Sequence, residues 1–117
     1  MSPNASSWTS VSDINLKDVT GTYPNALEDI CKIDPIKFTW KQHPENGPRV
    51  GVIAQSVQNI VPEAMGTVHN DIDGKDYLGV RYTELIPISI AAIQELGINL
   101  QAAMDRITAL EAQLASK

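Results

Sequence analysis

A serine and a lysine near the start of the sequence have the residue types of a proteolytic dyad. Ser12 and Lys17 stand five residues apart in the segment SDINLK. A serine hydroxyl is a weak nucleophile until a base removes its proton, and a lysine can be that base when burial lowers its pKa enough to leave it neutral. Pairs of this spacing also arise by chance among solvated polar residues, so the spacing alone does not separate the two interpretations.

The composition excludes several classes of function. The chain carries a formal net charge of −5 over 117 residues, and its lysines and arginines are not clustered. Nucleic-acid binding depends on clustered positive charge, so we expect no nucleic-acid partner. The single cysteine, Cys31, allows no internal disulfide, and we expect it to be a small core residue. Aromatic residues make up 5% of the chain, which suggests that a partner subunit supplies part of the burial.

Patterns for metal, cofactor and membrane binding are missing from the sequence. His43 and His69 have no cysteine or second histidine at ligand spacing. The acidic segment that begins at Asp71 resembles a calcium loop, but its twelfth position is Tyr82 rather than a glutamate, so we predict a hairpin turn there. Residues 1–11 lack the pattern of a signal peptide, and no run of 18 apolar residues exists. We therefore expect no metal, no cofactor and no membrane partner.

The residues before the C-terminal segment predict a small α+β body of short helices and short hairpins. Apolar residues at spacings of three and four indicate helices, strict alternation indicates strands, and Asn-Gly and Asp-Gly pairs indicate turns. The predicted elements are a helix over 24–33, paired strands over 36–41 and 49–54, a helix over 55–61, and paired strands over 67–69 and 77–82.

A heptad repeat runs from Thr83 to the end of the chain and predicts a long helix that associates with copies of itself. Pro87 is placed in its first turn, where the missing N–H costs little, and Gly97 costs about 1 kcal/mol relative to alanine. Antiparallel packing of this helix on its own domain is the alternative, although no second helix of matching length is predicted. The apolar seam positions are Ile86, Ile93, Leu96, Leu100, Ala103, Ile107, Leu110 and Leu114.

Several short motifs occur in an order that resembles one protein family. The resemblance runs from about Trp8 to Leu114, and its motifs are specific in combination rather than singly. The sequence resembles the self-cleaving C-terminal chaperone domain of phage endosialidases, tail spikes, tail fibres and neck appendages, and a related domain of eukaryotic myelin regulatory factors. The motifs are SDINLK at 12–17, AL at 26–27, FTW at 38–40, RVGVIAQSV at 49–57, VPE at 61–63, VRYTEL at 80–85 and AIQEL at 92–96.

The resemblance implies a Ser-Lys dyad at Ser12 and Lys17 and a cut immediately before the serine, at the Val11–Ser12 bond. It also implies a homotrimer, which the heptad periodicity alone does not fix. Asp13 and Gln55 are candidates for supporting roles because they lie within the shared motifs. The family usually has arginine where this sequence has Asn15, which puts in doubt a contact or charge that the arginine would supply.

The expected protein is therefore an autoproteolytic trimerisation chaperone. We expect residues 1–11 to be the end of an upstream fibre or linker segment and 12–117 to be the chaperone domain, with a body over 12–82 and a coiled-coil helix over 83–117. Its partners would be two further copies and the upstream fibre domain. It would act in the host cytoplasm during virion assembly, with its parent in the virion tail. The alternatives are a trimerisation module that does not cleave, the related domain of a membrane-tethered transcription factor, and a coiled-coil adaptor.

Overall fold

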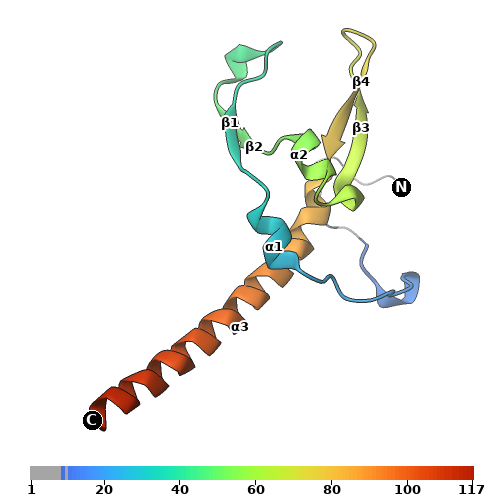
Figure 1. The fold of residues 1–117 in the computed structure, drawn as a ribbon. Helices are drawn as coiled ribbons and strands as arrows, with labels where there is room; N and C mark the ends of the chain where they lie inside the picture. Colours follow the sequence, from blue (N-terminus) through green and yellow to red (C-terminus); the bar gives the residue numbers. More distant parts are fainter. Residues whose placement is uncertain (1–8, 10) are drawn as a thin grey trace.

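One long helix carries a small body at its N-terminal end (Figure 1). The computed structural model describes residues 9 and 11–117, so most of the predicted upstream segment, residues 1–11, lies outside the described residues. The molecule measures 73 × 41 × 26 Å along its principal axes, because helix α3 (Tyr82–Ala115) extends far beyond the body. The predicted combination of short hairpins, short helices and a long C-terminal helix is confirmed.

The body consists of two antiparallel hairpins and several short helices. Each hairpin forms its own two-stranded sheet, β1 with β2 and β3 with β4. The elements are the 3₁₀ turn η1 (Ile14–Leu16), helix α1 (Ala26–Cys31), strand β1 (Ile36–Phe38), turn η2 (Pro44–Asn46), strand β2 (Arg49–Gly51), helix α2 (Ala54–Gln58), turn η3 (Pro62–Ala64), and strands β3 (Met65–His69) and β4 (Asp76–Val80).

The first hairpin is shorter than the sequence predicts. Lys37 pairs with Val50, and strand β2 ends at Gly51, whereas the prediction extended it to Ala54, which begins α2. A Cβ atom at Gly51 would lie 3.0 Å from the Tyr82 hydroxyl and from the Phe38 ring, so a larger residue here would require these side chains to shift. The Tyr82 hydroxyl also accepts a hydrogen bond from the backbone N–H of Val52, which links the end of the hairpin to the start of α3.

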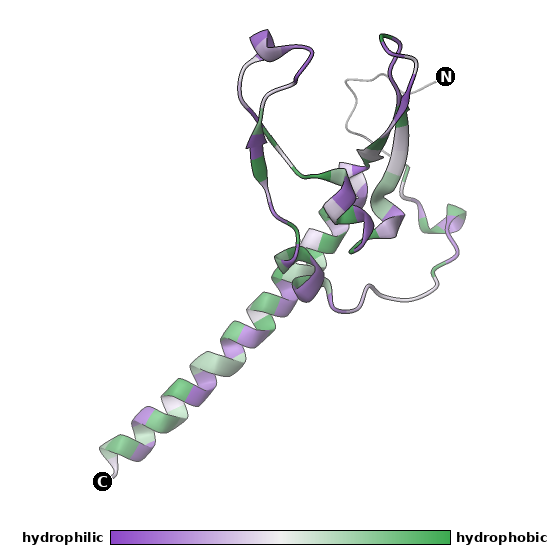
Figure 2. Cartoon of the chain, turned by 45° about the horizontal axis from the view of Figure 1, so that its top comes forward, coloured by the Kyte–Doolittle hydropathy of each residue, from purple (hydrophilic) through white to green (hydrophobic). Residues whose placement is uncertain are grey.

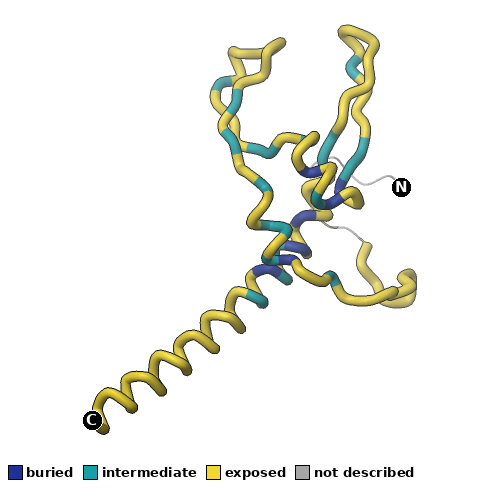
Figure 3. The backbone as a smooth tube through the Cα atoms, viewed as in Figure 1, coloured by how far each residue is buried: buried dark blue, intermediate teal, exposed yellow. Residues whose placement is uncertain are grey.

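The core is a single small cluster where α1, α2 and η3 meet the first turns of α3. Figure 3 shows the buried residues gathered at this junction, while both hairpin tips and the distal part of α3 are exposed. Most of the buried side chains are small, so this junction anchors the body but buries little apolar area. The buried residues are Ala26, Val57, Val61, Ala64, Leu85, Ile88 and Ala92.

Two local expectations are wrong. Cys31 is exposed rather than part of the core, because the residues of α1 that pack against the core lie on another face of this helix. Pro87 is the sixth residue of α3 and lies in the second turn, so the carbonyl of Thr83 has no N–H partner four residues later. The helix nevertheless continues, since Leu85 and Ile88 on either side of the proline are buried against the body.

Helix α1 is capped by a residue from α3. Its N-cap, Asn25, has a left-handed backbone with φ of 59° and makes no side-chain capping bond. Instead, the Glu95 carboxylate accepts hydrogen bonds from the backbone N–H of Ala26 at 3.1 Å and of Leu27 at 2.9 Å. One side chain of the long helix therefore satisfies two free donors of a helix 68 and 69 residues earlier in the chain.

Candidate functional site

The structure brings Ser12 and Lys17 together. The Nζ atom of Lys17 donates a hydrogen bond of 2.7 Å to the Oγ atom of Ser12. In an extended chain, residues five apart are separated by about 17 Å, so a turn is needed to bring these atoms into contact. The 3₁₀ turn η1 lies between them, with Ser12 before its N-cap and Lys17 as its C-cap.

Asp13 caps the turn that separates the two side chains. Its Oδ1 atom accepts hydrogen bonds from the backbone N–H of Asn15 at 2.9 Å and from the Asn15 side-chain amide at 3.0 Å. The backbone closes the turn with bonds from Leu16 to the Asp13 carbonyl and from Lys17 to the Ile14 carbonyl. The carboxylate of Asp13 is thus occupied as an acceptor, and an ionised carboxylate has no proton to donate to an oxyanion.

The pair lies in an exposed segment, residues 11–22, which we call the N-terminal arm. Every residue of the arm is exposed, including the apolar side chains of Val11, at 77%, and Leu16, at 75%. Figures 1 and 3 show η1 standing away from the rest of the body. A lysine base needs burial to lose its proton at neutral pH, and a single chain does not bury this one.

Gln55, the other candidate for a supporting role, lies on α2. In Figure 1 this helix sits in the centre of the body, apart from the turn that carries the pair. The structure of the single chain does not bring Gln55 to Ser12 and Lys17. Its side chain is exposed, and no hydrogen bond involving it is found in the described part of the chain.

The predicted seam of α3 is an uncovered apolar stripe. All eight seam residues are exposed, with Ile93 at 68% and Leu114 at 70%, and every residue from 96 to 117 is exposed. The side chains that pack on the body, such as Leu85, Ile88 and Ala92, occupy a neighbouring face of the helix. Attachment to the body therefore leaves the seam open along its whole length.

An apolar groove of about 350 Å³ lies at the head of the seam. Ile86 and Ser89, at the first two core positions of the heptad repeat, line this groove together with residues of α1 and of the segments that follow α1 and β2. The remaining lining residues are mostly aliphatic and include Ile30, Ile33 and Val52. The apolar surface of the seam thus continues from α3 onto the body.

Helix α3 is also long and apolar enough, by length and composition alone, to cross a membrane. Its polar residues, such as Gln94, Gln101, Asp105 and Arg106, recur along its whole length. Figure 2 shows hydrophobic and hydrophilic residues alternating along the helix. A one-sided stripe with a polar opposite side is typical of a helix that packs on other helices in water.

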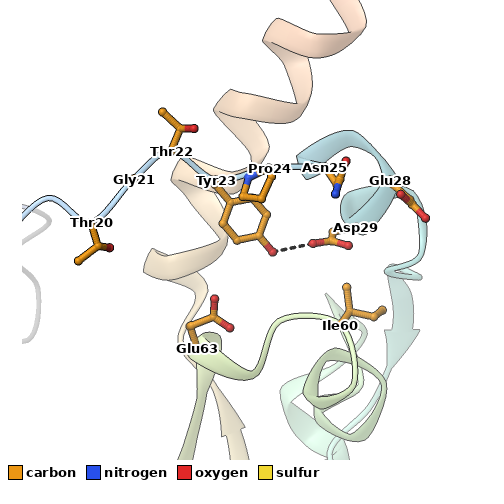
Figure 4. A pocket seen from close by; sticks show the side chains of 10 residues that line it. All are labelled: Thr20, Gly21, Thr22, Tyr23, Pro24, Asn25, Glu28, Asp29, Ile60 and Glu63. Atoms are coloured by element: carbon orange, nitrogen blue, oxygen red, sulfur yellow. Dashed lines mark hydrogen bonds between the residues drawn. The ribbon is translucent and has the colours of Figure 1, made fainter.

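An open cleft of about 750 Å³, which no local pattern in the sequence indicates, lies between the end of the arm and the body (Figure 4). The hydroxyl of Tyr23 donates a 2.7 Å hydrogen bond to Asp29 across this cleft. Burial raises the pKa of Tyr23 to about 12, aided by that bond and by the negative charges of Asp29 and Glu63. Among the described residues, no group of three histidine, cysteine, aspartate or glutamate side chains is placed to hold a metal ion.

Residues 12–66 match the family model Peptidase_S74, described as "Chaperone of endosialidase". This part of the chain is similar to the endosialidase chaperone family. The match covers Ser12 and Lys17, both strands of the first hairpin, α1 and α2, whereas α3 lies outside it. The resemblance found in the sequence is thereby confirmed.

A phage fibre protein is similar to most of this chain. The chain is 37% identical over 90 residues to "Long tail fiber protein Gp37" of Escherichia phage AR1. The alignment covers 72% of this chain and 8% of the relative. The chain therefore spans less than a tenth of that fibre protein's length, and the remainder of the fibre has no counterpart here.

Proposed function

We propose that this chain is the intramolecular chaperone of a phage tail fibre or tail spike, which trimerises its parent and then releases itself by cutting the Val11–Ser12 bond. The hydrogen bond between Lys17 and Ser12 is the observation that carries the proposal. Two further findings support it. The family match begins at Ser12, and the relative is a much longer fibre protein.

The proposed reaction uses the two side chains in turn. Neutral Lys17 takes the proton of the Ser12 hydroxyl, and Oγ attacks the carbonyl carbon of Val11. The C–N bond of the scissile peptide breaks, and the Ser12 nitrogen receives the proton from the Lys17 ammonium, which leaves an ester between Val11 and Ser12 Oγ. Water then hydrolyses the ester to a Val11 carboxylate, a free Ser12 hydroxyl and a new N-terminus at Ser12.

The reaction requires that another surface cover the N-terminal arm. A charged lysine can only donate to the serine, whereas a neutral lysine can also accept the hydroxyl proton. In the assembled trimer, neighbouring copies and the upstream fibre are the surfaces available to bury the arm. The exposed Val11 and Leu16 side chains give such a surface apolar groups to contact. Cleavage would therefore follow assembly.

The seam of α3 provides the assembly step of the proposal. Apolar residues at the heptad core positions favour self-association, and Ile90 and Met104, which follow two core positions, widen the exposed stripe. Joining three chains at one end raises the effective concentration of the upstream segments for one another. Removal of the trimeriser then leaves the mature fibre without the element that guided its folding, so the product is held kinetically. Assembly would take place in the host cytoplasm and leave the parent in the virion tail.

Intact mass spectrometry of the chain joined to its upstream fibre segment tests the proposal. We expect a product that begins at Ser12 in the wild type, and none in Ser12→Ala, Lys17→Ala or Lys17→Arg, since an arginine stays protonated. Ser56→Ala and Lys41→Ala are matched controls that should be cut normally. Cleavage of Ser12→Ala at the same bond would contradict the mechanism.

A trimerisation module that never cleaves is the second candidate, and the exposure of the arm favours it. It predicts a full-length mass for every variant together with a trimeric mass under native conditions. The fibre relative speaks against the domain of a membrane-tethered transcription factor, because that relative is a phage tail protein.

A further inference from the structure

We propose that Asp13 is a positioning residue, whose side-chain oxygen holds the η1 turn in the shape that places Lys17 against Ser12. The inference rests on the proposed cleavage function. It assigns to Asp13 a geometric role rather than a role in proton transfer or oxyanion binding.

The turn needs a stabilising element beyond its own backbone. It has three residues, Ile14, Asn15 and Leu16, and contains neither glycine nor proline. An isolated turn of this length fixes many dihedral angles for few hydrogen bonds and is unfavourable by itself. Ile14 is 65% exposed, and every residue of the turn is exposed, so packing against the body contributes little.

The side chain of Asp13 supplies what packing does not. A single oxygen, Oδ1, accepts from both the backbone N–H and the side-chain amide of Asn15. These two bonds stabilise the N-terminal end of the turn. The C-terminal end is stabilised by the hydrogen bond from the backbone N–H of Lys17 to the carbonyl of Ile14. Because Ser12 and Lys17 flank this turn directly, the separation of their side chains depends on its integrity.

The geometry distinguishes this role from an electrostatic one. Within the described part of the chain, no ion pair joins Asp13 to Lys17, and the carboxylate is directed to Asn15 instead. A negative charge close to the lysine would raise its pKa and make it a worse base at neutral pH. Asp13→Asn keeps an oxygen at the same position without the charge, so it separates the two roles.

Amide exchange of Asn15, measured by NMR on the chain itself, tests the turn without any cleavage. We expect Asp13→Ala to speed the exchange of the Asn15 N–H about fivefold, as loss of a typical N-cap bond would. Asp13→Asn should exchange like the wild type. Asp18→Ala is the matched control, since Asp18 is also an exposed carboxylate and lies just beyond the turn. Unchanged exchange in Asp13→Ala would overturn the inference.

The rate of cleavage across a range of pH tests the link to the reaction. In the chain joined to its upstream segment, Asp13→Ala should be cut about fivefold more slowly than the wild type, and Asp13→Asn at the wild-type rate with the same pH midpoint. A shifted midpoint in Asp13→Asn would show an electrostatic role and overturn the inference. If the wild type is not cut at all, the proposed function fails and the catalytic part of the inference fails with it, whereas the exchange experiment still decides the capping of the turn.

Discussion

The Lys17 ammonium nitrogen lies 2.7 Å from the Ser12 hydroxyl oxygen of the same chain. The five-residue separation and the intervening turn make this contact local, so it requires nothing from another subunit. What a second chain would add is burial of the pair rather than either reacting group. This division has a direct experimental consequence.

Mixed trimers of Ser12→Ala and Lys17→Ala chains should not be cut. Each chain lacks one member of the pair, and the contact in the structure joins Ser12 and Lys17 of the same chain. Co-expression of two differently tagged fibre fusions, followed by intact mass measurement, would detect a product from either. Mixed trimers of wild-type and Ser12→Ala chains are the control, in which the wild-type chains should be cut. A product in the first mixture would show that the dyad forms between chains.

The seam predicts that one added charge disrupts assembly only when it is placed on the apolar stripe. Leu100→Glu puts a carboxylate on the seam, whereas Ala102→Glu adds the same charge two residues later on another face of the exposed helix. We expect light scattering to show loss of the trimer in the first variant and a normal trimer in the second. Equal behaviour of both would contradict the seam. Insertion of the wild type into phosphatidylcholine vesicles, with loss of the trimer, would instead identify α3 as a membrane helix.

Gly97 predicts a stabilising substitution. A Cβ atom built at this position meets nothing within 4 Å in the single chain, and its backbone lies inside α3. Gly97→Ala should therefore stabilise the helix by about 0.5–1 kcal/mol through the lower entropy of the unfolded chain. Thermal unfolding followed by circular dichroism at fixed protein concentration would measure this. A lower melting temperature would reveal that a neighbouring chain approaches the helix closely at this glycine.

Tyr23 predicts a late step in the alkaline titration of the protein. Its pKa is about 12 in the folded chain, against 10.0 in the absence of its surroundings, because the ring is partly buried and the hydroxyl donates to Asp29. Above pH 10 the unfolded chain ionises first, so the contribution of Tyr23 to stability is present below pH 10 and is lost as the pH rises toward 12.

Phenolate absorbance of the wild type minus that of Tyr23→Phe would isolate this group. The subtraction is needed because a hydrogen bond to Asp73 also raises the pKa of Tyr77. A difference spectrum with its midpoint near pH 10 would show that the contact with Asp29 does not persist in solution.

Local patterns in the sequence predict the helices and strands, but they do not predict which distant elements come into contact. The heptad repeat located α3 to within one residue at its start, and the Asp-Gly pair located the turn of the second hairpin. The two strands of the first hairpin are shorter than predicted, β3 begins two residues earlier than predicted at Met65, and β4 ends at Val80, before α3 begins at Tyr82. The resemblance supplied Ser12 and Lys17, whereas the acidic cleft around Tyr23 arises from segments some 40 residues apart and leaves no local pattern.

The cap that Glu95 provides for α1 is a contact between elements far apart in the sequence. It predicts that replacing Glu95 lowers the stability of the folded chain. Its two carboxylate oxygens accept from the N–H groups of Ala26, which is fully buried, and Leu27. Glu95→Ala should lower the free energy of unfolding by about 1–3 kcal/mol, because it removes hydrogen bonds to a charged acceptor and leaves donors without partners. Glu95→Gln retains one acceptor oxygen and should fall between the alanine variant and the wild type.

Urea unfolding at a fixed chain concentration, in a Ser12→Ala background that prevents cleavage, would measure these differences. Glu111→Ala is the matched control, because Glu111 lies on the same helix in its exposed distal part and should tolerate alanine with little change. If both alanine variants unfold at the same urea concentration as their parent, α1 is not held by α3 through this carboxylate. If only Glu95→Ala unfolds early, the long helix that carries the seam also fixes the first helix after the N-terminal arm.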